Sequence, residues 1–215
     1  MQFYFIKTPK FIHSLYKKYT WNIDTDKKEI YLTFDDGPTP LVTEFVLDTL
    51  KKHKAKATFF CIGKNIEKHP ELFKRIINEG HIVGNHTQNH ENGWKTNNTN
   101  YLKSIDNCKS SITGLQTINN KQQTTIFRPP YGKIKRLQAK NLISKGYKII
   151  MWSVLSGDFD KGITKERCLK NVVNNTTKGD IIVFHDSKKA YKKLEYTLPK
   201  VLDFFNKKGF EFTKL

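Results

Sequence analysis

The stretch YLTFDDGPTP, Tyr31 to Pro40, joins an apolar run directly to a polar turn. Ile30–Phe34 is rich in β-branched and aromatic residues, which favours a buried strand. Asp35 and Asp36 follow it side by side, just before a Gly-Pro turn. Turns favour aspartate, but adjacent carboxylates repel each other, so the pair suggests a partner elsewhere in the chain.

The rest of the chain alternates between strand-like and helix-like segments. Helical patterns such as Thr39–His53 and Thr164–Thr177 separate most of the strand-like runs. After Ile30–Phe34, these runs are Ala57–Ile62, His81–Val83, Thr125–Phe127, Tyr147–Val154, Asp180–Phe184 and Phe210–Thr213. This alternation predicts a mainly parallel sheet with helices outside it. About seven strands and no second core predict a barrel-like (β/α) fold.

Composition narrows the class of protein further. The 215 residues suit one domain, and 37% hydrophobic with 13% aromatic residues is enough for a real core. Cys61, Cys108 and Cys168 are scattered without a CxxC pair. This spacing argues against a disulfide framework and against a cysteine zinc site. We expect reduced, buried thiols.

The net charge of +18 comes from 38 Lys and Arg against 20 Asp and Glu. The lysines are spread as pairs, such as Lys17-Lys18 and Lys207-Lys208, and no block of five like charges occurs. A nucleic-acid binder would concentrate this charge, so we expect solvated helix faces and no nucleic-acid partner. No signal peptide and no run of roughly 20 apolar residues is visible. Taken literally, the sequence predicts a cytoplasmic location, unless a leader was trimmed or export follows another route. We also expect a monomer.

Polar clusters follow the predicted strands. They are Asp35-Asp36, HTQNH (86–90), FRPPYG (127–132), WSVLSGDF (152–159) and FHD (184–186). Active sites of parallel α/β folds gather at the carboxyl ends of the strands. We therefore expect the five clusters on one rim, although each has a plain alternative, such as a turn for the aspartates.

His86 and His90 are four residues apart, so one helical turn would point both imidazoles the same way. Two imidazole nitrogens and one carboxylate make a three-ligand metal site with positions left open. An incidental solvent-facing pair is the alternative, which the aspartates on the same rim disfavour. A cation would neutralise one aspartate and leave its neighbour to act as a base. Arg128 could hold that base in place.

The motifs TFDDGP, HTQNH, RPPYG, WSVLSGDF and VFHD, in this order, resemble the polysaccharide deacetylases with the NodB homology domain, carbohydrate esterase family 4. The resemblance extends from about Ile30 to the C-terminus. It divides the chain into an N-terminal extension, 1–29, and a NodB-type deacetylase domain, 30–215. The helical spacing of apolar residues within Pro9–Tyr19 predicts that the extension packs on the barrel as an extra helix. It implies a distorted (β/α) barrel that removes N-acetyl groups from peptidoglycan or chitin-like N-acetylglucosamine polymers.

The resemblance also implies roles at the metal. Asp35 would be the general base, oriented by Arg128. Asp36 would bind one divalent ion together with His86 and His90. In the family this ion is usually zinc, with cobalt, nickel or manganese as the other choices.

The resemblance also implies that His185 is the general acid and that Asp158 holds its ring and adjusts its pKa. It further implies that the backbone amide of Tyr131 helps to form the oxyanion hole. The expected groove residues are Trp152, Pro130, Val183 and Phe159. Two of them depart from the family pattern, because Val183 replaces the usual leucine and Phe159 the usual tryptophan.

Three other functions predict sequence features that differ from those of a deacetylase. A superfamily amidohydrolase acting on a cyclic amide or ureide would be expected to alter the metal motifs, which are complete here. A catalytically silent carbohydrate-binding domain predicts the loss of Asp35 or His185, and both are present. A basic nucleic-acid-binding protein predicts a clustered patch of charge. The sequence favours the deacetylase over all three.

Overall fold

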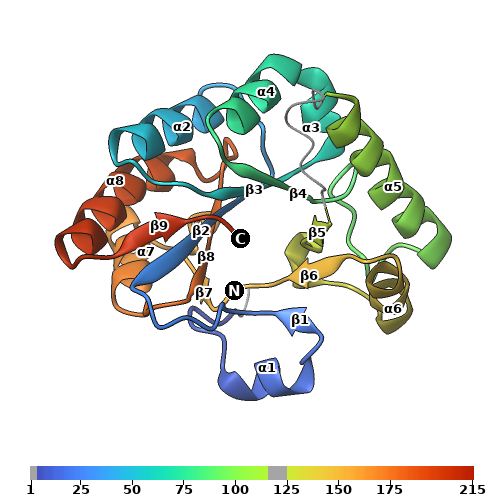
Figure 1. Ribbon diagram of the computed structural model, residues 1–215, viewed down its shortest axis with the longest axis horizontal. Helices are drawn as coiled ribbons and strands as arrows, with labels where there is room; N and C mark the ends of the chain where they lie inside the picture. Colours follow the sequence, from blue (N-terminus) through green and yellow to red (C-terminus); the bar gives the residue numbers. More distant parts are fainter. Residues whose placement is uncertain (1–3, 116–124) are drawn as a thin grey trace.

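A parallel sheet with helices outside it forms the body of the molecule in the computed structural model, which describes residues 4–115 and 125–215 (Figure 1). The strands are β1 (Tyr19–Thr20), β2 (Glu29–Asp35), β3 (Thr58–Cys61), β4 (Ile82–Asn85), β5 (Ile126–Phe127), β6 (Lys148–Ile150), β7 (Val154–Leu155), β8 (Ile181–His185) and β9 (Glu211–Thr213). The helices are α1 (Lys10–Leu15), α2 (Val42–Lys52), α3 (Gly63–Lys68), α4 (Pro70–Asn78), α5 (Asn98–Gly114), α6 (Arg136–Ser144), α7 (Lys165–Val173), α8 (Tyr191–Lys207) and the 3-10 turn η2 (Pro130–Gly132).

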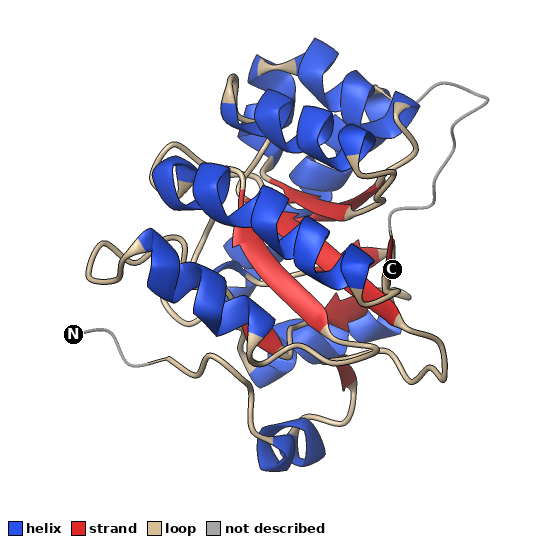
Figure 2. Cartoon of the chain, turned by 90° about the vertical axis from the view of Figure 1, so that its left-hand side faces the viewer, coloured by secondary structure: helices blue, strands red, loops and turns tan. Residues whose placement is uncertain are grey.

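The strand order is β1-β6-β5-β4-β3-β2-β8-β7, and β9 pairs with the start of β2. Every strand pair is parallel, so the carboxyl ends share one edge. The sheet curves and the helices cover its outer face, as the turned view in Figure 2 also shows. The predicted distorted (β/α) barrel is confirmed.

Within the described residues the sheet has nine strands, where about seven were predicted. The run Tyr147–Val154 is not one strand, because it changes partners in the middle. The Met151 N–H donates to the Thr20 carbonyl, whereas the Ser153 N–H donates to the Ile181 carbonyl of β8. This switch separates β6 from β7. The other additional strand, β1, is two residues long and too short to leave a sequence pattern.

The main core lies between the sheet and helices α2, α3, α4, α5, α7 and α8. Phe34 of β2 is at its centre, with ring centroids 5.1 Å from Phe59 and 6.0 Å from Phe184. All three rings are fully buried. The three cysteines are free and buried, as expected. Within the two described ranges, no helix has both the length and the apolar character needed to cross a membrane.

The N-terminal part of the chain lies against the same sheet. β1 pairs with β6, and Ile12 of α1 packs on the cluster that contains Trp21. The His13 ring stacks on the Trp21 ring at 5.2 Å. The chain before β2 therefore forms one edge of the sheet, where β1 lies next to β6.

Phe34→Ala should lower the free energy of unfolding by about 3–5 kcal/mol, because it removes a fully buried ring and leaves a cavity. Urea denaturation followed by far-UV circular dichroism would measure the loss. Phe11→Ala is the matched control, since Phe11 is 61% exposed and its replacement should change stability by no more than about 0.5 kcal/mol. Equal losses in the two variants would contradict this description of the core.

Candidate active site

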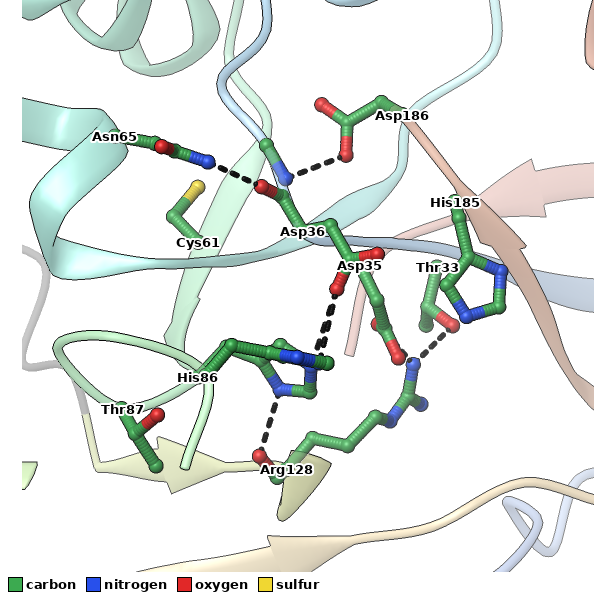
Figure 3. Close-up of polar contacts among 12 residues, drawn as sticks. Thr33, Asp35, Asp36, Cys61, Asn65, His86, Thr87, Arg128, His185 and Asp186 are labelled. Carbon is green, nitrogen blue, oxygen red and sulfur yellow. Dashed lines mark hydrogen bonds and ion pairs between the residues drawn. The ribbon is translucent and has the colours of Figure 1, made fainter. Parts of the chain in front are cut away.

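The carboxylates at the end of β2 point in different directions. Asp35, the last residue of the strand, faces Arg128, and Asp36, the next residue, faces the histidines (Figure 3). Asp36 has φ 82°, in the left-handed region that residues other than glycine seldom adopt. Two side chains hold this turn. The Asn65 amide donates to the Asp36 carbonyl at 2.7 Å, and the Gly37 N–H donates to Asp186 Oδ1 at 2.9 Å. The adjacent aspartates therefore serve two different partners.

Arg128 is completely buried behind Asp35. Its Nη1 donates to Asp35 Oδ1 at 2.7 Å and to Thr33 Oγ1 at 2.6 Å. Its Nη2 and Nε donate to the carbonyls of Met151 and Ile150. Burial lowers the pKa of Arg128 from its usual value, and the Asp35 carboxylate opposes that change. The guanidinium thus holds Asp35 in one orientation at the end of β2.

The HTQNH segment is a loop, so the predicted helical turn is wrong. Thr87 and His90 both have positive φ, at 65° and 61°. The loop is held by contacts outside itself: the Thr87 N–H donates to the Asn85 side chain and the Gln88 N–H donates to Ser104 Oγ. The two imidazoles still converge, with ring centroids 5.1 Å apart. The expected pairing is present, but tertiary contacts produce it.

Asp36, His86 and His90 form a cluster whose potential ligand atoms lie within 4.8 Å of one another. His86 Nδ1 lies 2.8 Å from the Arg128 carbonyl, which can only accept, so the proton is on Nδ1 and Nε2 carries a lone pair. That lone pair faces Asp36 Oδ1, 3.7 Å away, and His90 Nε2 lies 3.2 Å from the same oxygen.

Asp36 Oδ1 is buried and accepts no hydrogen bond from any residue in the described ranges. Burial would raise the pKa of Asp36, but His90, with His185 and His86, holds it well below its usual range. Burial lowers the pKa of His86 to about 4, so its imidazole is neutral at pH 7. An anionic oxygen and an imidazole lone pair that face each other fit a bound cation.

His185 lies beside Asp35, because β2 and β8 pair in register at these two residues. Asp158 is fully buried and contacts His185 at two points. Its Oδ2 accepts a hydrogen bond from the backbone N–H of His185 at 2.7 Å, and its Oδ1 lies 2.8 Å from His185 Nδ1. Burial alone would lower the pKa of His185, but the carboxylates of Asp158, Asp36 and Asp35 together outweigh it and raise the pKa to about 9, with Asp158 first among them. The imidazolium form therefore prevails at neutral pH.

The remaining sequence-predicted residues surround this centre. Tyr131 has φ 61° and is 57% exposed, with its ring 4.5 Å from the His90 ring. The Phe159 ring lies 5.1 Å from the His185 ring. Val183 and Pro130 are buried, whereas Trp152 is partly exposed. The Trp152 ring lies 5.8 Å from the Arg128 guanidinium. Tyr131, Phe159 and Trp152 therefore each lie next to a charged or metal-cluster residue of the site.

Asp186 is a site residue that the sequence analysis did not assign. It is fully buried, and its carboxylate accepts from the Gly37 N–H and from Thr43 Oγ1 at 2.6 Å. A Cβ on Gly37 would lie 1.9 Å from Asp186 Oδ2, so only glycine fits there. The one signal in the sequence was a charged residue directly after His185. Asn65 and Thr33 left no such signal, because their roles come from the fold.

Comparisons with known proteins identify the family of the chain. The family model described as polysaccharide deacetylase matches residues 22–150 and confirms the resemblance. Two relatives from Bacillus cereus are both named peptidoglycan-N-acetylglucosamine deacetylase. One is 36% identical over 92% of this chain and 70% of its own, and the other is 34% identical over 90% and 89%. The crystal structure of the Bc1960 peptidoglycan N-acetylglucosamine deacetylase superposes with a TM-score of 0.87 at 35% identity, covering 97% of this chain and 95% of that one.

Asp186→Ala should weaken metal affinity by about 10- to 100-fold, because the turn that carries Asp36 loses its anchor. Calorimetric titration of the metal-free protein with zinc would measure this, alongside a thermal melt to check folding. Asp186→Asn keeps an acceptor oxygen for the Gly37 N–H and should lose less. If the alanine variant bound zinc as tightly as the wild type, this role for Asp186 would be wrong.

Proposed function

We propose that this chain, which belongs to the polysaccharide deacetylase family, is a metal-dependent hydrolase that removes N-acetyl groups from amino sugars. The observation that carries the proposal is that Asp35 and His185 lie in register on neighbouring strands, beside the Asp36 cluster. A base and an acid therefore flank one cation site. The names of the relatives support peptidoglycan as the polymer.

Asp36, His86 and His90 would hold the divalent ion. Two imidazoles with one carboxylate are typical of catalytic zinc, which supports zinc over cobalt, nickel or manganese. When bound, the ion would supply a Lewis acid for the acetamide carbonyl and would lower the pKa of the attacking water.

Asp35 accepts the proton of that water in this mechanism. Its carboxylate stays oriented because Arg128 Nη1 donates to one of its oxygens. The backbone N–H of Tyr131 donates to the oxyanion that develops on the former carbonyl. The left-handed conformation of Tyr131, which turns the backbone away from regular structure at this rim, supports this role.

His185 donates a proton to the departing amine, so that the carbon–nitrogen bond breaks without release of an unstable amide anion. Asp158 holds the ring through Nδ1, which leaves Nε2 to deliver the proton. Acetate and a free amino sugar are the products. No covalent intermediate is needed.

The first test is acetate release from N-acetylglucosamine oligomers and from peptidoglycan. Activity should be lost with a chelator and recovered with zinc or cobalt, because the carbonyl is no longer polarised in the metal-free protein. Turnover of small cyclic amides or ureides in place of sugars would support the amidohydrolase alternative. Sugar binding without any turnover in the metal-loaded protein would support a silent carbohydrate-binding domain.

A second test separates the two aspartates. Asp35→Asn should abolish turnover and leave zinc bound, because only a proton acceptor is lost. Asp36→Asn should weaken zinc affinity directly, because a ligand is lost. Metal content after dialysis and acetate release would be measured on the same samples. Equal loss of zinc from both variants would contradict this division of roles.

The pH dependence of kcat/KM tests the acid. Because His185 must be protonated and its pKa is raised to about 9, activity should fall as the pH rises through its basic limb. A bound cation would repel the imidazolium and lower that limb, so variants are compared at equal metal loading. Asp158→Asn should move the limb to lower pH, since it removes the carboxylate that raises the pKa. His185→Ala should lose about 10²–10⁴-fold in rate. An unmoved limb in Asp158→Asn would rule out His185 as the acid.

A further inference from the structure

The segment before α1 lies along the rim of the barrel as a short antiparallel neighbour of β7. The Leu155 N–H donates to the Ile6 carbonyl at 2.8 Å, and the Thr8 N–H donates to the Ser153 carbonyl at 2.9 Å. Lys7 forms an antiparallel bridge with Val154, and its Nζ lies 2.6 Å from Asp180 Oδ2. The backbone of this segment is therefore held at a fixed position beside the active site.

Tyr4 links the segment to the loop that carries the proposed acid's partner. Its hydroxyl donates to Asp160 Oδ2 at 2.7 Å, and its ring lies 5.3 Å from the Phe159 ring. Phe159 in turn lies 5.1 Å from His185. A chain of aromatic contacts thus leads from His185 to the N-terminal segment.

A hollow of about 170 Å³ opens between this segment and the rim. We call it the N-terminal hollow. Its aromatic lining residues are Tyr4, Phe5 and Trp21 from the chain before β2, together with Tyr131 and Trp152 from the motif segments. Pockets that hold whole drug-sized ligands measure roughly 300–1,000 Å³. The N-terminal hollow therefore suits one ring of a larger ligand rather than a complete ligand.

Tyr131 lies between the hollow and the candidate active site. That residue lines the hollow, and its ring lies 4.5 Å from His90 of the metal cluster. A polymer bound with an acetamide at the cluster therefore has this hollow as its neighbour. Aromatic faces that are partly open to solvent suit the C–H faces of a pyranose ring, because they bury apolar surface without removing hydroxyl groups from water.

We propose that the N-terminal hollow is a subsite for a sugar ring next to the one that is deacetylated, so that residues before β2 help to select for chain length. This proposal rests on the proposed function. The ring would belong to the same amino-sugar polymer as the reacting unit.

The test compares kcat and KM for acetate release from N-acetylglucosamine oligomers, from the dimer to the hexamer. In the wild type, kcat/KM should rise with length up to the oligomer that reaches the hollow. Phe5→Ala should lower kcat/KM about tenfold for the oligomers that reach the hollow and leave shorter oligomers unchanged. The loss should appear mainly in KM, because one aromatic contact is lost. Phe11→Ala is the matched control, since this exposed phenylalanine lies on α1 and does not line the hollow. It should keep the wild-type length dependence.

Two outcomes would overturn the subsite. One is a length dependence that Phe5→Ala leaves unchanged. The other is an equal loss for all oligomers in Phe5→Ala, which would indicate a structural role for this ring.

Binding to the inactive Asp35→Asn protein, with and without Phe5→Ala, separates this proposal from the proposed function. Calorimetric titration with the same oligomers would be used, with zinc present. If the wild type releases no acetate but long oligomers bind Asp35→Asn more tightly than short ones in a Phe5-dependent way, the proposed function fails and the subsite stands. If no oligomer binds, or if Phe5 makes no difference, the subsite falls.

Discussion

The buried ion pair between Arg128 and Asp35 is the interaction on which the active site depends. A guanidinium removed from water costs several kcal/mol unless a charge and hydrogen-bond acceptors compensate it. Here the carboxylate of Asp35 and the backbone carbonyls of Ile150, the last residue of β6, and Met151 supply them, and the guanidinium lies 4.2 Å from the Phe60 ring. The orientation of Asp35 therefore depends on three strands at once, because β2, β3 and the end of β6 surround the same side chain.

Parallel pairing sets the other distances in the site. Asp35 is in register with Phe60 on β3 and with His185 on β8, so the proposed base and the proposed acid are one strand spacing apart. That spacing is about 4.8 Å in any sheet. What the fold adds locally are buried carboxylates behind the functional groups: Asp158 behind His185, and Asp186 behind the turn that carries Asp36. Both have apolar or hydrogen-bonded surroundings that leave them little freedom to move.

The side of the barrel between β6 and β7 is completed by chain that precedes all the motifs. β1 pairs with β6, and the segment from Tyr4 to Thr8 runs beside β7. This is the place where the strand order β1-β6 to β8-β7 has its two ends. The surface on this side therefore takes its shape from residues that precede the family motifs.

The sequence by itself determined the class of fold and the set of rim residues. Strand-like runs that alternate with helices predict a parallel sheet, and parallel strands carry their carboxyl ends on one edge, so Asp35, His86 and His185 could be placed together before any coordinates. The ends of the strands could not be predicted as well from the sequence. The run Tyr147–Val154 divides into two strands where its hydrogen-bond partner changes from Thr20 to Ile181.

Only the tertiary structure decided how these residues are oriented and charged. The HTQNH loop owes its left-handed turns to Asn85 and Ser104, and a four-residue spacing alone suggested a helix. The raised pKa of His185 likewise needs Asp158, which is distant in sequence, together with burial. Spacing along a chain reports which groups can meet. The spacing does not report how deeply these groups are buried or which of their atoms face each other. Burial and orientation set the chemistry of the site, and both come from the tertiary structure.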